Sequence, residues 1–164
     1  MKVTLINPPQ RFTKFQINAG VIPPLGIMYL ASALRVAGHE PCVIDSIVED
    51  VENIYDLEGG FSCRGLGFTE IIERIPSDTS LICFSNLFSI GFPITSLLAK
   101  ETKNAFPDIP IAVGGAHCSA LPMETISEPS IDFVGVGEGE ETIVQFVNNL
   151  HDLNAIKKID WLAY

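Results

Sequence analysis

The stretch between residues 81 and 115 constrains the fold most strongly. An apolar, strand-like segment ends there in Ser85, Asn86 and Leu87, a helix-like run follows, and a second apolar segment ends in Gly114 and Gly115. In a chain that alternates strands and helices, both endings lie at the same edge of a parallel sheet. Ligands bind outside the carboxyl ends of such strands. The sequence therefore predicts a ligand site built from these two loops.

Strand-like and helix-like segments alternate along the chain. We expect strands over residues 2–6, 42–44, 80–84, 110–113 and 132–136, and helices over residues 25–37, 68–75, 93–106, 122–127 and 140–150. Five strand-then-helix repeats in 164 residues predict an α/β fold: a doubly wound, five-stranded parallel sheet with helices on both faces, flavodoxin-like or Rossmann-like. We expect the domain to span residues 1–150 and residues 151–164 to begin a linker.

Two segments resist assignment. The first, residues 10–22, reads as a long irregular loop with Arg11, Lys14 and Asn18, and two interpretations remain open: a functional loop or a mobile surface excursion. The second, residues 48–67, is acidic at its start and glycine-rich at its end, and the sequence predicts no element there.

Charge and apolar content exclude several classes of function. The net charge of −10, from 10 basic and 20 acidic residues, disfavours binding to nucleic acid and to an anionic membrane surface. Residues 79–99 carry no charge, but polar residues in their middle favour a buried strand, a loop and a helix start over a membrane span. The first residues lack the pattern of a signal peptide, so we expect a cytoplasmic protein.

The four cysteines lack the spacing of a metal site. Cys42 and Cys83 lie in apolar strands and are expected to be core residues. Cys63 and Cys118 are expected in loops, where a thiol is accessible, although no neighbouring residue indicates a lowered pKa. The sequence thus predicts no metal ligands and no catalytic residue.

The loop after the first strand argues against two common cofactor and signalling sites. Asn7, Pro8, Pro9 and Gln10 supply neither the glycines nor the hydroxyls of a phosphate-binding loop, which disfavours a flavodoxin-type FMN site. The same loop lacks the acidic pair of a phospho-acceptor domain.

A glycine-rich turn follows the last predicted strand. Gly135, Gly137 and Gly139 alternate with other residues, as in a dinucleotide-binding turn, but such a turn follows the first strand and has a longer fingerprint. Glu138 lies within this turn and is a candidate for contact with polar groups of a ligand or of a further domain, or for a simple helix N-terminal acid.

The pairing of Ser85-x-Leu87 with Gly114-Gly115 resembles the cobalamin-binding domains. In that family these two motifs line a slot for the nucleotide tail of base-off cobalamin. Paired glycines let a flat base lie against the backbone, and a serine hydroxyl can hydrogen-bond a tail atom. Read alone, Gly114-Gly115 is more typical of an ordinary tight turn, and Ser85 of a turn or helix-capping serine. The two motifs together, at this spacing and on these strands, favour cobalamin.

The sequence departs from the family's pattern after the first strand. The family's Asp-x-His-x-x-Gly supplies a histidine to cobalt, but Asn7-Pro8-Pro9-Gln10 stands here. The resemblance therefore implies cobalamin bound base-off without a histidine lower ligand. His117, next to the glycine pair, is either a contact to the corrin or its tail, or a partly exposed loop histidine.

The set of motifs as a whole resembles the N-terminal domain of cobalamin-dependent radical SAM enzymes. The motifs are Asn-Pro-Pro, Pro-Pro-Leu-Gly-Ile-Met-Tyr-Leu-Ala-Ser-Ala-Leu, Gly-His-Glu, Gly-Gly-Ala-His and Val-Gly-Glu-Gly-Glu-Glu-Thr. The resemblance implies a C-terminal radical SAM domain with a [4Fe-4S] cluster and S-adenosylmethionine. The Cys-x3-Cys-x2-Cys motif of that domain does not occur in these residues.

The resemblance leaves two further functions to compare. One is a degenerate interaction domain that packs on a catalytic barrel and binds no cofactor. The other is an α/β domain for a different nucleotide cofactor. The residues expected at a cobalamin site are Asn7, Pro8, Pro9, Gln10, Ser85, Asn86, Leu87, Gly114, Gly115, His117, Gly135, Gly137 and Glu138.

Overall fold

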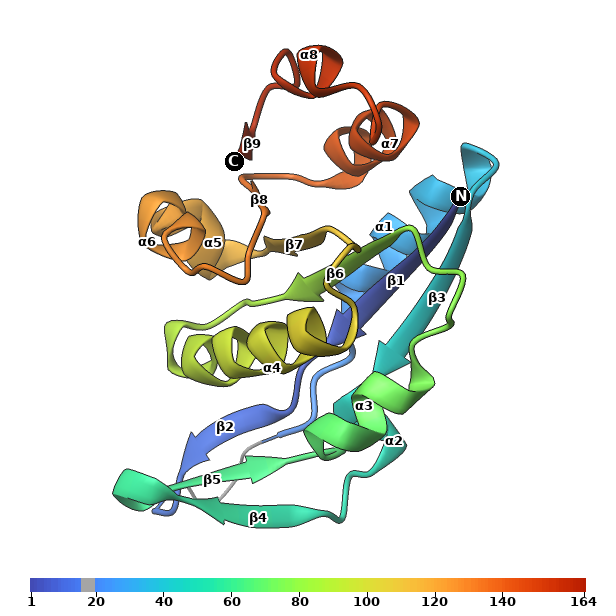
Figure 1. Cartoon of the computed structure of the whole chain (residues 1–164). Coiled ribbons are helices and arrows are strands. Elements are labelled where there is room, and N and C mark those ends of the chain that lie inside the picture. The colour runs from blue at the N-terminus through green and yellow to red at the C-terminus, as the bar shows by residue number, and fades with distance from the viewer. Residues whose placement is uncertain (16–19) are drawn as a thin grey trace.

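A single large sheet forms the centre of the molecule (Figure 1). The computed structural model describes residues 1–15 and 20–164. In those residues the sheet has six strands in the order β3-β1-β6-β7-β8-β9. The strands are β1 (Lys2–Asn7), β3 (Glu40–Asp45), β6 (Leu81–Ser85), β7 (Ile111–Gly114), β8 (Phe133–Gly135) and β9 (Leu162–Ala163).

The first five of these strands run parallel, and β9 pairs antiparallel with β8. Their order corresponds to the flavodoxin-like arrangement, in which the chain changes direction beside the first strand. The predicted five-stranded, doubly wound parallel sheet is confirmed, and the structure adds a sixth strand at its edge.

Helices cover both faces of the sheet, with α4 in front and α1 behind in Figure 1. One face carries α1 (Leu25–Val36), α7 (Glu140–Asn148) and α8 (Leu153–Ile156). The other carries α3 (Phe68–Arg74), α4 (Phe92–Ala105), α5 (Ala116–Ala120) and α6 (Pro122–Ile126).

Helix α1 shows how the sequence sets an element's limits. Its start follows two prolines, which are tolerated in a first turn, and Gly38 follows its end with φ +84°. Its sequence is apolar nearly all round, but only one side of the helix is buried. Ile27 and Leu34 are indeed buried against the sheet, but Met28 is 53% exposed and lies on the outer face.

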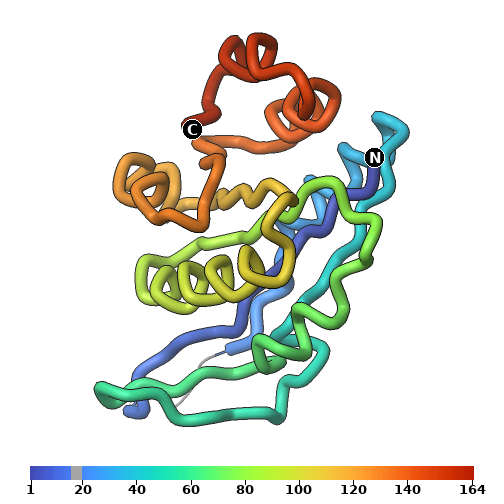
Figure 2. Tube along the Cα trace, viewed as in Figure 1, coloured from blue at the N-terminus to red at the C-terminus, as the bar shows by residue number. Residues whose placement is uncertain are grey.

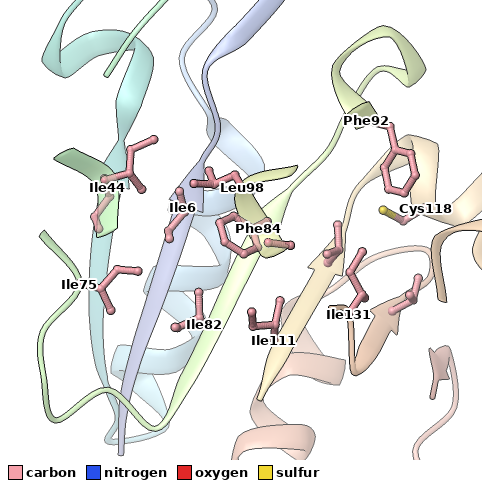
Figure 3. Packing of buried hydrophobic residues seen from close by; sticks show 14 of the residues in the cluster. Ile6, Ile44, Ile75, Ile82, Phe84, Phe92, Leu98, Ile111, Cys118 and Ile131 are labelled. Atoms are coloured by element: carbon pink, nitrogen blue, oxygen red, sulfur yellow. The ribbon is translucent and has the colours of Figure 1, made fainter. Parts of the chain in front are cut away.

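Two hydrophobic cores result from the alternation of side chains along buried strands. Leu5 and Ile6 are neighbours in β1, yet both are fully buried because they point to opposite faces. Figure 3 shows the larger core, where Ile6, Ile82 and Ile111 of three adjacent strands pack beneath the helices on their face. A strand that is buried on both faces reads as a nearly continuous apolar run, as β6 does from Leu81 to Phe84.

A small antiparallel sheet lies beyond the carboxyl ends of β1 and β3, at the lower end of the tube in Figure 2. Because residues 10–13 form a strand of this sheet, the expectation that residues 10–22 begin as an irregular loop is wrong. The other elements of the small sheet account for most of residues 48–67, where the sequence predicted no element. Its strand order is β2-β5-β4. The elements are β2 (Gln10–Thr13), α2 (Ser46–Glu49), β4 (Ile54–Leu57), the 3-10 turn η1 (Glu58–Gly60) and β5 (Phe61–Arg64).

Side chains of β2 and the residue after it tie this small sheet together and to the rest of the molecule. Arg11 places its guanidinium 3.7 Å from the centre of the Phe61 ring and donates a hydrogen bond of 3.0 Å to the carbonyl of Ile90. Lys14 forms an exposed ion pair of 2.8 Å with Asp56. The third residue named for this segment, Asn18, lies outside the described residues.

The residues after His151 pack on the domain. Ile156 is 1% exposed and Ile159 is 9% exposed, and β9 completes one edge of the main sheet. The uncharged run at residues 79–99 forms β6, the 3-10 turn η2 (Ser89–Gly91) and the start of α4. Among the residues that the structure describes, no helix has the length and apolar character needed to cross a membrane.

Candidate functional site

A cavity of about 640 Å³ opens at the carboxyl edge of the main sheet. Strands β6, β7 and β8 form its floor, and helices α1 and α7 form the opposite wall. Seven of the thirteen residues predicted for a cobalamin site line it: Ser85, Leu87, Gly114, Gly115, Gly135, Gly137 and Glu138. The structure thus brings together the two motifs that the sequence singled out and the glycine-rich turn after the last parallel strand.

The strand register explains why space remains here. Ser85 lies beside Gly114, and Gly114 lies beside Gly135, so three of the smallest side chains form one row across the sheet. We call this the edge row. Two residues deeper, Cys83 lies beside Ala112, which makes a second row of small side chains on the same face. Between these rows and helices α1 and α7 the cavity remains open.

Gly114 and Gly135 keep the floor of the slot flat. A Cβ on Gly114 would lie 3.8 Å from the carbonyl oxygen of Gly135, and one on Gly135 would lie 4.0 Å from the Cα of Gly114. Both are ordinary contacts. The backbone therefore tolerates a side chain at either position, and that side chain would occupy the cavity.

Gly115 serves a different purpose in the same turn. Its φ of +123° and ψ of −179° lie in a region that other residues essentially never adopt. A Cβ there would stand 2.6 Å from the carbonyl oxygen of Asn86. This glycine is required by the close approach of the two loops, so its role is to build the turn.

Asn86 is the residue on the other side of that approach, and it is 3% exposed. Its N–H donates to the carbonyl of Gly114 at 2.7 Å, and its own carbonyl accepts from the N–H of His117 at 3.3 Å. Its side-chain oxygen accepts a hydrogen bond of 3.0 Å from the hydroxyl of Thr95. Asn86 lies outside the cavity lining and joins the loops that carry Leu87 and Gly114.

Ser119 is a cavity residue that the sequence did not indicate. Its hydroxyl donates to the carbonyl of Gly115 at 3.1 Å and accepts from the N–H of Gly137 at 2.8 Å. It therefore links the glycine pair to the glycine-rich turn. A detectable signal existed in the sequence, because Ser119 lies four residues after Gly115 and one helical turn places it over that residue.

The cavity mouth offers free hydroxyls and carboxylates. Ser85 of β6 and Thr142 of α7 both line the cavity, and in the described part of the chain neither hydroxyl has a hydrogen-bond partner. Glu138 is exposed at the mouth and Glu140 is half-buried there. Each hydroxyl is able to donate one hydrogen bond and to accept others from a ligand.

His117 lies on the far side of the sheet from the cavity. It is 4% exposed, its ring centre lies 4.4 Å from that of Phe92, and Nδ1 is 2.9 Å from the Ser89 hydroxyl. Its Nε2 atom is buried and has no partner in the residues described. The expectation of a partly exposed loop histidine is wrong, because helix α5 carries His117 into the core. A contact to the cofactor stays a prediction.

The loop after β1 also lies apart from the cavity lining. The Asn7 amide donates to the carboxylate of Asp45 at 2.9 Å, which joins the ends of β1 and β3. Pro8 and Pro9 are buried, and Gln10 begins β2. These four residues sit at the carboxyl edge of the sheet, on the side where the small sheet starts.

The cysteines differ from the expectation in two places. Cys63 and Cys118 were expected in loops, but they lie in β5 and α5 and are fully buried. Burial raises the pKa of the Cys118 thiol to about 11. Cys83 faces the cavity from β6, and its apolar surroundings raise the pKa of its thiol to about 12. In the described residues no three His, Cys, Asp or Glu side chains gather into a metal site.

Fold and site together define a flavodoxin-like α/β domain with a slot between the carboxyl edge of its sheet and two helices. The family model of the B12 binding domain matches residues 18–147, and this chain belongs to that family. The resemblance to cobalamin-binding domains that the sequence indicated is thereby confirmed.

Known relatives are much longer proteins. The chain is 28% identical over 153 residues to the cytidylyl-2-hydroxyethylphosphonate methyltransferase of Streptomyces wedmorensis, a match that covers 92% of this chain and 28% of that protein. It is 26% identical over 168 residues to the anaerobic magnesium-protoporphyrin IX monomethyl ester cyclase of Synechocystis sp., covering 100% of this chain and 30% of that protein. The chain thus spans less than a third of the length of either relative.

The fold also matches solved structures. One is the radical S-adenosylmethionine methyltransferase TsrM from Kitasatospora setae with cobalamin and a [4Fe-4S] cluster bound. It superimposes with a TM-score of 0.67 at 18% identity, over 98% of this chain and 26% of that one. At this identity the match concerns the fold alone.

Proposed function

We propose that this chain binds cobalamin and holds the nucleotide tail of the cofactor in the cavity between the sheet and helices α1 and α7. The observation that carries the proposal is the edge row: Ser85, Gly114 and Gly135 stand side by side and leave a slot at the sheet edge where ligands of such folds bind. A volume of about 640 Å³ is within the range of small-molecule sites.

The residues present fit such a ligand. The absence of side chains at Gly114 and Gly135 gives a flat base room against the backbone. The unpartnered hydroxyls of Ser85 and Thr142 suit polar atoms of the tail. When bound, cobalamin supplies a cobalt centre that carries a methyl group, while the protein binds and orients the cofactor.

We further propose that the tail binds away from cobalt and that no histidine of this chain replaces it. None of the three histidines lines the cavity. His39 is at the opposite edge, 3.1 Å from Asn148 through Nε2, and His117 is buried on the other face. The Asn7 amide at the end of β1 is engaged with Asp45.

The proposal extends to the protein of which such a domain is a part. The relatives are over three times as long, and one structural match has both cobalamin and a [4Fe-4S] cluster bound. We therefore propose that this domain serves a radical SAM enzyme, as a partner of a radical SAM domain in the same chain, in methyl transfer or related radical chemistry. The [4Fe-4S] cluster and S-adenosylmethionine would be held by that second domain.

Hydroxocobalamin binding tests the proposal. The purified chain is mixed with hydroxocobalamin and desalted, and we expect retained corrinoid with the absorption spectrum of the base-off form. Gly114→Leu fills the slot without backbone strain and should abolish retention. Ala37→Leu, at the exposed end of α1, adds a similar apolar group and should leave it unchanged. Loss of all corrinoid from the unaltered chain on desalting would contradict the proposal.

Gly115→Leu is a poor probe of the slot, although the motif suggests it. Because a Cβ at Gly115 would collide with the backbone of Asn86, this substitution disrupts the turn itself. A loss of binding would then report unfolding as readily as a blocked cavity. Gly114→Leu and Gly135→Leu avoid that ambiguity.

A further inference from the structure

The deep part of the cavity differs in chemistry from its mouth. Leu5, Cys83 and Ala112 lie side by side on three adjacent strands, two residues below the strand ends. Ile143 and Phe146 of α7 face them across the cavity. We call these five residues the deep layer. Four are hydrocarbon side chains, and the fifth is a thiol that burial keeps protonated.

The backbone of the deep layer offers a ligand no hydrogen bond either. Strand β6 lies between β1 and β7, and β7 lies between β6 and β8, so both have ladder partners on each side. The N–H and C=O groups of Cys83 and Ala112 are therefore engaged within the sheet. A polar atom that reached this depth would lose its water and gain no partner.

The polar groups all lie nearer the mouth. Ser85 and Ser119 stand at the strand ends and in the helix that follows, and Glu138 and Glu140 flank the start of α7. Thr142 is four residues before Phe146 on the same helix face, so the hydroxyl lies toward the mouth and the phenyl ring toward the interior. The cavity thus grades from polar to apolar along its depth.

We propose that the deep layer makes this chain selective for the base of the corrinoid tail. It accepts a benzimidazole base, whose outer edge is hydrocarbon, and disfavours a purine base, whose amino group and ring nitrogens would be buried without partners. This inference rests on the proposed binding of cobalamin and names the class of corrinoid that the site takes. An unpaired buried polar group costs enough to weaken binding by roughly five- to a hundredfold.

Three hydroxo- or aquo-corrinoids test this selectivity when titrated into the purified chain with absorbance detection. They are cobalamin itself, the analogue with adenine in place of dimethylbenzimidazole, and cobinamide, which has no base. We expect the benzimidazole form to bind most tightly, with the adenine form weaker by roughly five- to a hundredfold. Equal affinity for the two tailed corrinoids would overturn the inference while leaving the proposed function standing.

Two more outcomes are equally decisive. If cobinamide binds as tightly as cobalamin, the base makes no use of the deep layer and the inference fails. If none of the three binds, the proposed function fails and the inference with it.

A designed variant adds a positive test. Ala112→Ser places a hydroxyl in the deep layer and should reduce the preference for benzimidazole over adenine several-fold, because the purine then finds a partner. The matched control is Ala33→Ser, on the outer face of α1, which should keep the ratio of the unaltered chain. An unchanged ratio in a folded Ala112→Ser variant would count against the deep layer as the selective element.

Discussion

Replacing Gly115 by alanine should destabilise the domain far more than replacing its neighbour Gly114. The two glycines are adjacent in sequence and in the same turn, but only Gly115 has a left-handed φ, of +123°. The pair therefore separates the need for a particular backbone conformation from the need for an open cavity.

The structure sets the size of the effect. A residue other than glycine in this conformation costs about 1–3 kcal/mol. The Cβ that Gly115→Ala adds would stand 2.6 Å from the carbonyl oxygen of Asn86, a residue that cannot move freely because hydrogen bonds join it to Gly114, His117 and Thr95. Overpacking of this kind costs about 1–3 kcal/mol more. The sum, roughly 2–6 kcal/mol, is a large part of a typical stability of about 5–15 kcal/mol.

Urea unfolding followed by far-ultraviolet circular dichroism measures the difference. We expect Gly115→Ala to lower the free energy of unfolding by roughly 2–6 kcal/mol, or to prevent folding. Gly114→Ala should stay within about 1 kcal/mol of the unaltered chain, because its Cβ meets only ordinary contacts. Equal unfolding midpoints for the two variants would refute the assignment of the tight turn to Gly115.

Two further predictions concern the cavity wall and alkaline pH. Ser119→Ala removes the hydrogen bond to the N–H of Gly137. We expect it to lower the free energy of unfolding in urea by about 1 kcal/mol and to weaken retention of hydroxocobalamin. The control Ser127→Ala, at an exposed helix end, should leave retention unchanged. Burial raises the pKa of the Cys83 thiol from 9.0 to about 12, so the thiol loses its proton at lower pH in the unfolded chain than in the folded one. The stability that the protonated thiol contributes is therefore complete below pH 9 and is lost as the pH rises toward 12. Urea midpoints between about pH 8 and 10.5 should therefore fall less steeply for Cys83→Ala.

Much of the main fold was predictable because its elements carry local signals. Apolar runs of a few residues, with prolines or glycines between them, placed all five parallel strands and the principal helices within a few residues of their observed limits. The small sheet gave no such signal. Its strands have four residues each, and β2 pairs with β5 across about fifty residues of sequence, so neither strand is recognisable before the fold brings them together.

His117 shows why proximity in sequence to a ligand loop is a weak guide. It lies two residues after Gly115, but helix α5 begins between them and each helical residue turns the side-chain direction by about 100°. His117 and Cys118 are consequently directed into the core on the far face, and Ser119 is the one that turns back over the glycine pair. Predicting this outcome requires knowing that a helix starts directly after the turn.

The cavity itself follows from register more than from any single motif. In a parallel sheet the pairing of neighbouring strands decides which side chains stand abreast, and here it aligns Ser85 with Gly114 and Gly114 with Gly135. A shift of β8 by two residues would bring the phenyl ring of Phe133, which now lies beside Ala112, next to Gly114 and close part of the slot. The separation of the two motifs in sequence therefore matters only because the strands pair in this register. That alignment is fixed by the apolar residues of two cores, so the packing that stabilises the domain also sets the shape of its ligand site.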